Sequence, residues 1–162
     1  MNGPRALVFR ALSTAGVRYL VVGGVAVVLH GHLRATVDLD LVLDLEPENT
    51  ARALDALVAA GFRPVAPVPV REFADPATRE RWAREKQMVV FSLWTDADPT
   101  FKVDLFVEEP FDFAAAWDRA AAVELAGVEV RVVSLSDLLA MKRRAGRPQD
   151  LADVAALAEI AR

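Results

Sequence analysis

Apolar residues recur along the chain with two different periods, and these periods predict alternating helices and strands. Alternating apolar and polar positions, or short β-branched runs, predict strands, whereas apolar positions three or four residues apart predict helices. The expected strands are 19–22, 37–43, 88–94 and 101–107, followed by a hairpin over 123–133. The expected helices are 4–15, 25–30, 47–60, 76–86, 111–117, 135–145 and a last one that begins at Pro148.

This order of elements predicts one α+β domain over residues 1–162, with a mixed sheet of about five strands and helices packed on it. A chain of 162 residues fits one domain of ordinary size. The stretch 62–70 is extended, but its prolines confine it to a sheet edge or a loop. The composition, 54% hydrophobic and 26% charged, is that of a globular rather than a disordered chain.

Several classes of function are excluded by composition. The chain has no cysteine, which excludes disulfides, thiolate zinc sites and cysteine nucleophiles and fits the reducing cytoplasm, the location we expect. The net charge of −4 disfavours general nucleic-acid binding, so extended duplex nucleic acid is not an expected partner. The longest apolar run, 19–29, is too short to cross a membrane, so no membrane partner is expected.

Asp38 and Asp40 stand two residues apart on the predicted strand 37–43, so their carboxylates leave the same face. Two neighbouring carboxylates repel each other unless a cation lies between them. Divalent magnesium or manganese suits such oxygen ligands. The alternative is that both residues simply belong to the solvated face of a half-exposed strand, and for a bare Asp-x-Asp pattern that alternative would be preferred.

Two further features favour a site for a nucleoside triphosphate. Gly23-Gly24 lies between a strand and a helix, where glycine lets phosphate oxygens approach the backbone. Asp104 lies on the polar face of strand 101–107, and three carboxylates would converge if that strand neighboured 37–43; such a set could hold two metal ions. The alternative for Asp104 is a surface pair with Lys102, but Phe106 beside it suggests a partly enclosed face.

These residues resemble the signature of the polymerase-β-type nucleotidyltransferase superfamily, which combines a glycine turn, an Asp-x-Asp strand and a third acidic residue on an adjacent strand. The pattern Gly-Gly-x-Ala-x-x-x-His-Gly-x-x-Arg-x-Thr-x-Asp-x-Asp, from Gly23 to Asp40, is similar to small prokaryotic nucleotidyltransferase-like proteins, including abortive-infection nucleotidyltransferase toxins. The tail residues Lys142, Arg147, Asp150 and Asp153 resemble the Lys-x4-Arg-x2-Asp-x2-Asp motif of those toxins.

The resemblance implies transfer of a nucleoside monophosphate from an NTP to a hydroxyl acceptor, with Mg²⁺ or Mn²⁺ as cofactor. The acceptor could be an RNA end such as that of tRNA, a protein or a small molecule, and a cognate toxin or antitoxin is a possible partner. The implied catalytic and metal-binding residues are Asp38, Asp40 and Asp104. The implied nucleotide-binding residues are Gly23, Gly24, Arg34, Thr36, Lys142 and Asp150.

Some alternatives stay open at this point. Lys142, Arg143 and Arg144 could form the solvated end of a helix, where cations suit the helix dipole. Gly-Gly stands where the family more commonly has Gly-Ser, which removes a hydroxyl from the expected phosphate site. The whole protein could also be a non-catalytic nucleotide-binding module, or an interaction protein that keeps the fold without the activity.

Overall fold

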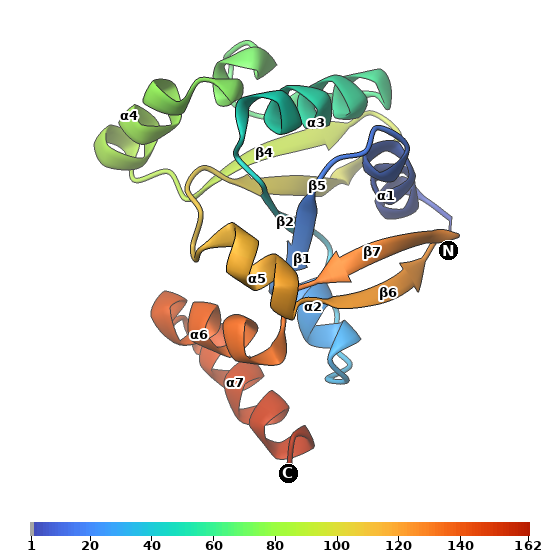
Figure 1. The fold of residues 1–162 in the computed structure, drawn as a ribbon, viewed down its shortest axis with the longest axis vertical. Coiled ribbons are helices and arrows are strands. Elements are labelled where there is room, and N and C mark those ends of the chain that lie inside the picture. Colours follow the sequence, from blue (N-terminus) through green and yellow to red (C-terminus); the bar gives the residue numbers. More distant parts are fainter. Residues whose placement is uncertain (1) are drawn as a thin grey trace.

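The centre of the protein is a mixed sheet with the strand order β3-β4-β5-β2-β1-β7-β6 (Figure 1). The computed structural model describes residues 2–162. The expected α+β fold is confirmed, but the sheet has seven strands rather than about five. The strands are β1 (Tyr19–Val22), β2 (Leu39–Leu43), β3 (Phe62–Pro64), β4 (Val90–Thr95), β5 (Asp98–Phe106), β6 (Ala121–Leu125) and β7 (Val128–Val132).

The helices follow the capping signals of the sequence. Proline occupies the first turn of α1, α3, α4 and α7, where its missing N–H costs nothing. The hydroxyl of Ser134 accepts a bond of 3.2 Å from the backbone N–H of Asp137 and caps α6. The helices are α1 (Pro4–Thr14), α2 (Gly23–Leu29), α3 (Pro47–Ala59), the 3₁₀ helix η1 (Val70–Ala74), α4 (Pro76–Lys86), α5 (Phe113–Arg119), α6 (Leu135–Ala145) and α7 (Pro148–Ile160).

β2 and β5 are parallel neighbours, and their register places Asp40 directly opposite Asp104. The flanking pairs are Leu39 with Val103 and Leu41 with Leu105, and all four of these side chains are fully buried. Burying each of them contributes roughly 1.5–3 kcal/mol, and a slip of one residue would turn them out of the core. The apolar residues therefore fix the register that brings the two carboxylates together.

The start of β2 differs from the sequence prediction. The strand begins at Leu39 rather than Val37, and Asp38 lies in a bend before it. Val37, which would share the buried face of Leu39 if the strand began at residue 37 as expected, is 58% exposed. The physical reason is that the carbonyls of Thr36 and Val37 accept hydrogen bonds from Arg5 of α1 instead of joining the sheet.

The C-terminal helices α6 and α7 pack against each other and lie at the opposite end of the molecule from α3 and α4 (Figure 1). α2 contacts both β2 and α6, so it connects the sheet to this helical pair. Within residues 2–162, every helix is too short or too polar to cross a membrane.

Candidate active site

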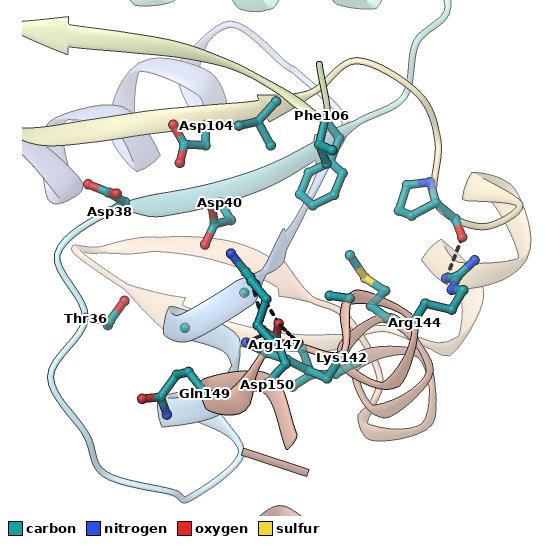
Figure 2. A pocket seen from close by; sticks show the side chains of 18 of the residues that line it. Thr36, Asp38, Asp40, Asp104, Phe106, Lys142, Arg144, Arg147, Gln149 and Asp150 are labelled. Atoms are coloured by element: carbon teal, nitrogen blue, oxygen red, sulfur yellow. Dashed lines mark hydrogen bonds and ion pairs between the residues drawn. The ribbon is translucent and has the colours of Figure 1, made fainter. Parts of the chain in front are cut away.

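A cavity of about 950 Å³ lies between the sheet and the α6–α7 pair (Figure 2). One wall is formed by β2, β5 and the start of α2, and the facing wall by the end of α6 and the start of α7. All of the residues predicted to form the site line it: Gly23, Gly24, Arg34, Thr36, Asp38, Asp40, Asp104, Lys142 and Asp150. The fold therefore gathers residues that lie more than 120 positions apart in the sequence.

Asp40 and Asp104 form the acidic wall of this cavity (Figure 2). The pKa of Asp40 is raised to about 6, chiefly by burial and also by the negative charges of Asp104 and Asp38, although Lys142 and the backbone N–H of Gly24 oppose the rise. The pKa of Asp104 is also raised, chiefly by burial, although the hydroxyl of Ser92 donates to its Oδ1 over 2.6 Å. The charged forms of both carboxylates are therefore disfavoured in the metal-free site, and a bound cation would stabilise them.

Asp38 stands apart from this pair. It lines the same cavity, but Figure 2 shows it on the loop that leads into β2, with its carboxylate to one side of Asp40 and Asp104. Across the described residues 2–162, no three potential metal-binding side chains are gathered into one cluster. The three acidic residues thus share a cavity wall without forming a closed ligand set.

The donor set nevertheless fits a hard divalent cation. Magnesium usually takes one or two protein carboxylates and completes its octahedron with water and substrate phosphates. Asp40 and Asp104 supply two such carboxylates in strand register, and the raised pKa of Asp40 reflects a local excess of negative charge. Asp38 is close enough to affect the pKa of both residues through its charge, so it is available as a third ligand.

The two glycines have a definite steric role. Gly23 has a φ of +64°, and a Cβ there would overlap the carboxylate of Asp40. A Cβ at Gly24 would overlap the hydroxyl of Thr36 and would lie 3.2 Å from Nη2 of Arg34. These glycines belong to the first turn of α2 rather than to a separate turn before it, and they leave room for side chains of the cavity itself.

The facing wall is built around Lys142. This lysine is only 6% exposed, and its ammonium lies 3.1 Å from Asp150 and 2.9 Å from Asp153. The idea that Lys142 belongs to a solvated helix end is therefore wrong, whereas Arg143 and Arg144 are exposed as that idea expects. A buried ammonium between two buried carboxylates is held in one position, with its charge near the cavity.

Asp153 also ties Arg34 to this wall. Nε and Nη2 of Arg34 bind its two carboxylate oxygens over 2.8 and 2.9 Å. Asp153 is fully buried, and Gln149 donates to it as well. Burial alone would raise the pKa of Asp153, but the hydrogen bonds from Arg34, Lys142 and Gln149 and the charge of Lys142 lower it overall. Arg34 therefore faces the cavity as half of an ion pair.

Some residues of this site were not among those predicted from the sequence. Asp153 and Arg147 stood in the tail motif, but without an assigned role; the Arg147 side chain binds Asp150, with Nε 2.6 Å from the carboxylate. Ser92 is opposite Asp104 in the β4–β5 ladder, which only the strand pairing reveals. Gln149 carries no signal in the sequence that distinguishes it from a surface glutamine.

Paired carboxylates thus lie on a mixed sheet, beside a helix that begins with two glycines. The family described as "Nucleotidyl transferase AbiEii toxin, Type IV TA system" matches residues 6–162. The chain belongs to this family of nucleotidyltransferases, and the resemblance inferred from the sequence is confirmed. No curated protein matches the sequence.

Solved structures of nucleotidyltransferases have a similar fold. The lincosamide antibiotic adenylyltransferase LnuA, solved with lincomycin, is 16% identical, with a TM-score of 0.61 and 98% of each chain covered. The enzyme ANT(2")-Ia, solved with adenylyl-2"-tobramycin, is 16% identical, with a TM-score of 0.57 and coverage of 95% of this chain and 84% of that one. The Thermotoga maritima protein TM1012 is 16% identical, with a TM-score of 0.56 and coverage of 94% and 88%. At these identities the likeness concerns the fold.

Proposed function

We propose that this nucleotidyltransferase moves a nucleoside monophosphate from an NTP to a hydroxyl acceptor, with release of pyrophosphate, and that it needs Mg²⁺ or Mn²⁺. The observation that carries the proposal is the strand register that sets Asp40 beside Asp104, facing the buried Lys142 across one cavity. An acidic wall opposite a cationic wall suits a metal-bound triphosphate, whose metal and phosphates need opposite charges.

In this proposal Asp40 and Asp104, with Asp38 beside them, hold the divalent ion. The ion, when bound, neutralises the triphosphate and lowers the pKa of the attacking hydroxyl. Asp104 is assigned to accept the proton of that hydroxyl, because its carboxylate lines the cavity beside Asp40, where the metal-bound acceptor would lie. Ser92 fixes the rotamer of Asp104 through its hydrogen bond of 2.6 Å.

The remaining predicted residues are assigned to the nucleotide. Lys142 supplies positive charge to the phosphates, and Asp150 positions it across 3.1 Å. The first turn of α2 at Gly23 and Gly24 offers close approach to the backbone, despite the absence of the serine that relatives more often carry. Arg34 and Thr36 border the same space and would contact the phosphates or the sugar.

The acceptor is proposed by class only. An RNA end such as that of tRNA, a protein side chain and a small molecule all present a suitable hydroxyl. LnuA, solved with lincomycin, and ANT(2")-Ia, solved with adenylyl-2"-tobramycin, illustrate the small-molecule case for those proteins. Because the family is described as part of a type IV toxin–antitoxin system, we further propose that this chain acts as a toxin with a cognate antitoxin. The absence of cysteine supports action in a reducing cytoplasm.

The test is a pyrophosphate-release assay with each NTP and Mg²⁺, supplemented in turn with total RNA, total protein and a pool of hydroxylated small molecules. The proposal predicts release with at least one acceptor class, and its loss in Asp40→Ala. Asp118→Asn is the matched control, because it removes an exposed carboxylate elsewhere and should leave the rate unchanged.

A non-catalytic nucleotide-binding module would give a different pattern. Calorimetry would then detect binding of a non-hydrolysable NTP with Mg²⁺, while no acceptor class would release pyrophosphate. A protein that keeps the fold only for interaction would bind no NTP at all. Either result would contradict the proposed transfer reaction.

A further inference from the structure

The loop between α2 and β2 carries three of the residues assigned to the site, Arg34, Thr36 and Asp38, yet it has little structure of its own. Residues 32–37 belong to no helix or strand. Among residues 2–162, no backbone N–H of positions 33–38 donates to a backbone carbonyl. The position of Asp38 therefore has to be fixed by side chains that reach the loop from elsewhere.

Burial does not fix the loop either. Leu33 is 82% exposed and Val37 is 58% exposed, so its two large apolar side chains contribute almost nothing to the core. A second cavity of about 310 Å³ lies beside the loop and shares Arg34, Ala35 and Thr36 with the first. The segment 34–36 thus has open space on two sides and could shift into either.

Two attachments hold this segment. The first attachment is to α7, the last helix, where Arg34 binds the buried carboxylate of Asp153. The second is to α1, the first helix, where Nη2 of Arg5 donates to the carbonyls of Thr36 and Val37 over 3.1 and 3.0 Å. Arg5 also lines the second cavity, so its side chain lies on the open side of the loop.

Arg5 holds the two carbonyls that directly precede Asp38. One planar guanidinium that bonds both of them restricts the peptide planes on either side of Val37. Nε of Arg5 is buried without a hydrogen-bond partner, so the side chain keeps this position although one of its own donors is unsatisfied. The free-energy cost of this unsatisfied Nε is consistent with a side chain that is held in place by its two bonds to the loop carbonyls.

We propose that Arg5 is a positioning residue of the active site, which fixes the 34–38 loop so that the carboxylate of Asp38 can join Asp40 and Asp104 around the divalent ion. The inference rests on the proposed function, because it concerns the metal of that same reaction. Arg5 does not line the active-site cavity and acts only through the loop backbone.

The experiment compares wild type with Arg5→Ala, Arg5→Lys and Arg10→Ala in two measurements. Arg10 is the matched control: it lies on the same helix and makes one exposed contact, of 3.4 Å, to the carbonyl of Ala126. The first measurement is Mn²⁺ affinity by electron paramagnetic resonance in the absence of NTP. The second is the rate of tryptic cleavage after Arg34 in metal-free protein, followed by mass spectrometry.

The proposal expects Arg5→Ala to weaken Mn²⁺ binding about tenfold, the lower end of the usual effect of losing an outer-shell partner. Cleavage after Arg34 should accelerate, and Arg5→Lys should be intermediate because its ammonium lies on a more flexible side chain than the planar guanidinium and holds the two carbonyls less firmly. Free guanidinium ion should restore part of the affinity of Arg5→Ala, and Arg10→Ala should match wild type in both measurements.

Unchanged Mn²⁺ affinity and unchanged cleavage in a folded Arg5→Ala protein would overturn the proposal. If wild type itself bound no Mn²⁺, the metal-dependent function would fail, while the cleavage rate would still report whether Arg5 holds the loop. If Arg5→Ala did not fold, Arg5→Lys would provide the same comparison, and wild-type behaviour of that variant in both measurements would count against a requirement for the guanidinium at this position.

Discussion

At the scale of single residues, the site is built at a cost to stability. Asp40 has a pKa raised to about 6 from 3.8, so its folded-state value lies above its unfolded value. Protonated Asp40 therefore favours the folded over the unfolded state. This contribution to the free energy of unfolding is fully present below the ordinary pKa and is lost as the pH rises through about 6. At neutral pH the charged carboxylate then costs the metal-free fold roughly 2–3 kcal/mol.

Replacing Asp40 with asparagine should therefore stabilise the metal-free protein. We expect Asp40→Asn to raise the melting temperature at pH 7.5 and to change it little at pH 4, where the wild-type carboxyl is largely protonated. Differential scanning calorimetry at the two pH values measures this, with Asp118→Asn as the control for a lost surface charge. A lower melting temperature for Asp40→Asn at pH 7.5 would show that the carboxylate stabilises the fold.

The same titration predicts how metal binding responds to pH. A divalent ion competes with the proton for Asp40, so Mn²⁺ affinity should rise between pH 5 and pH 7 and level off above the pKa of about 6. Calorimetric titrations with Mn²⁺ at several pH values check this, and Asp40→Asn should remove most of the pH dependence. An affinity that is flat across this range would argue against Asp40 as a ligand.

Gly23 is the residue whose replacement should be least tolerated. Gly23→Ala introduces a Cβ at positive φ and against the carboxylate of Asp40, so it should both destabilise the fold and displace a proposed metal ligand. Gly127→Ala is a matched control, because its φ is +79° but nothing lies within 4 Å of the added Cβ. Urea denaturation should show a loss of about 1–2 kcal/mol for the control and a larger one for Gly23→Ala; equal losses would contradict the close-approach argument.

At the scale of elements, α7 is joined to α6 and to the loop before β2 by buried charges. Asp153 accepts from Lys142 of α6 and from Arg34 of the loop, and removing its charge would leave Lys142 with Asp150 alone. Breaking a buried ion pair costs about 3–5 kcal/mol, because the remaining charge stays buried. The ion network therefore shapes the cationic wall of the cavity as well as the stability of the C-terminal pair.

Asp153→Asn should destabilise the protein by about 3–5 kcal/mol in urea denaturation. Asp96→Asn provides the comparison: its partner Arg63 lies 2.5 Å away, but the Asp96 side chain is 76% exposed. An exposed pair contributes at most about 1 kcal/mol, so Asp96→Asn should be nearly neutral. Similar losses for the two variants would mean that the Asp153 network contributes no more than a surface pair.

The sequence predicted elements well where local physics determines them. The helix starts follow proline and serine signals that act within one turn, and the hairpin expected over 123–133 forms as β6 and β7, with its turn at Ala126 and Gly127. The prolines of 62–70 confine this stretch to a sheet edge or a loop, and its first residues do form β3, an edge strand that pairs antiparallel with β4. The start of β2 was placed two residues early, because a contact with Arg5, more than 30 positions away, decides it.

At the scale of the whole molecule, the site exists only because distant segments meet. The carboxylates could be identified from the alternation of their strands, but the proximity of Asp40 and Asp104 was conditional until the sheet order showed β2 beside β5. The cationic wall could not be derived from spacing alone, since burial of Lys142 depends on how α7 packs on α6. The proximity of the two carboxylates and the burial of Lys142 both depend on long-range packing, and local sequence patterns therefore could not predict them.

The proposed function requires above all that Asp40 and Asp104 support transfer of a nucleoside monophosphate, with its α-phosphate, from an NTP to an acceptor. The most direct measurement incubates the protein and Mg²⁺ with total cellular RNA, total protein and a pool of hydroxylated small molecules, using NTP labelled either at the α- or at the γ-phosphate. We predict that label from the α-position becomes attached to a macromolecule or small acceptor, that label from the γ-position does not, and that Asp104→Asn abolishes the transfer. Attachment of the γ-label, or transfer that survives in both Asp40→Ala and Asp104→Asn, would contradict it.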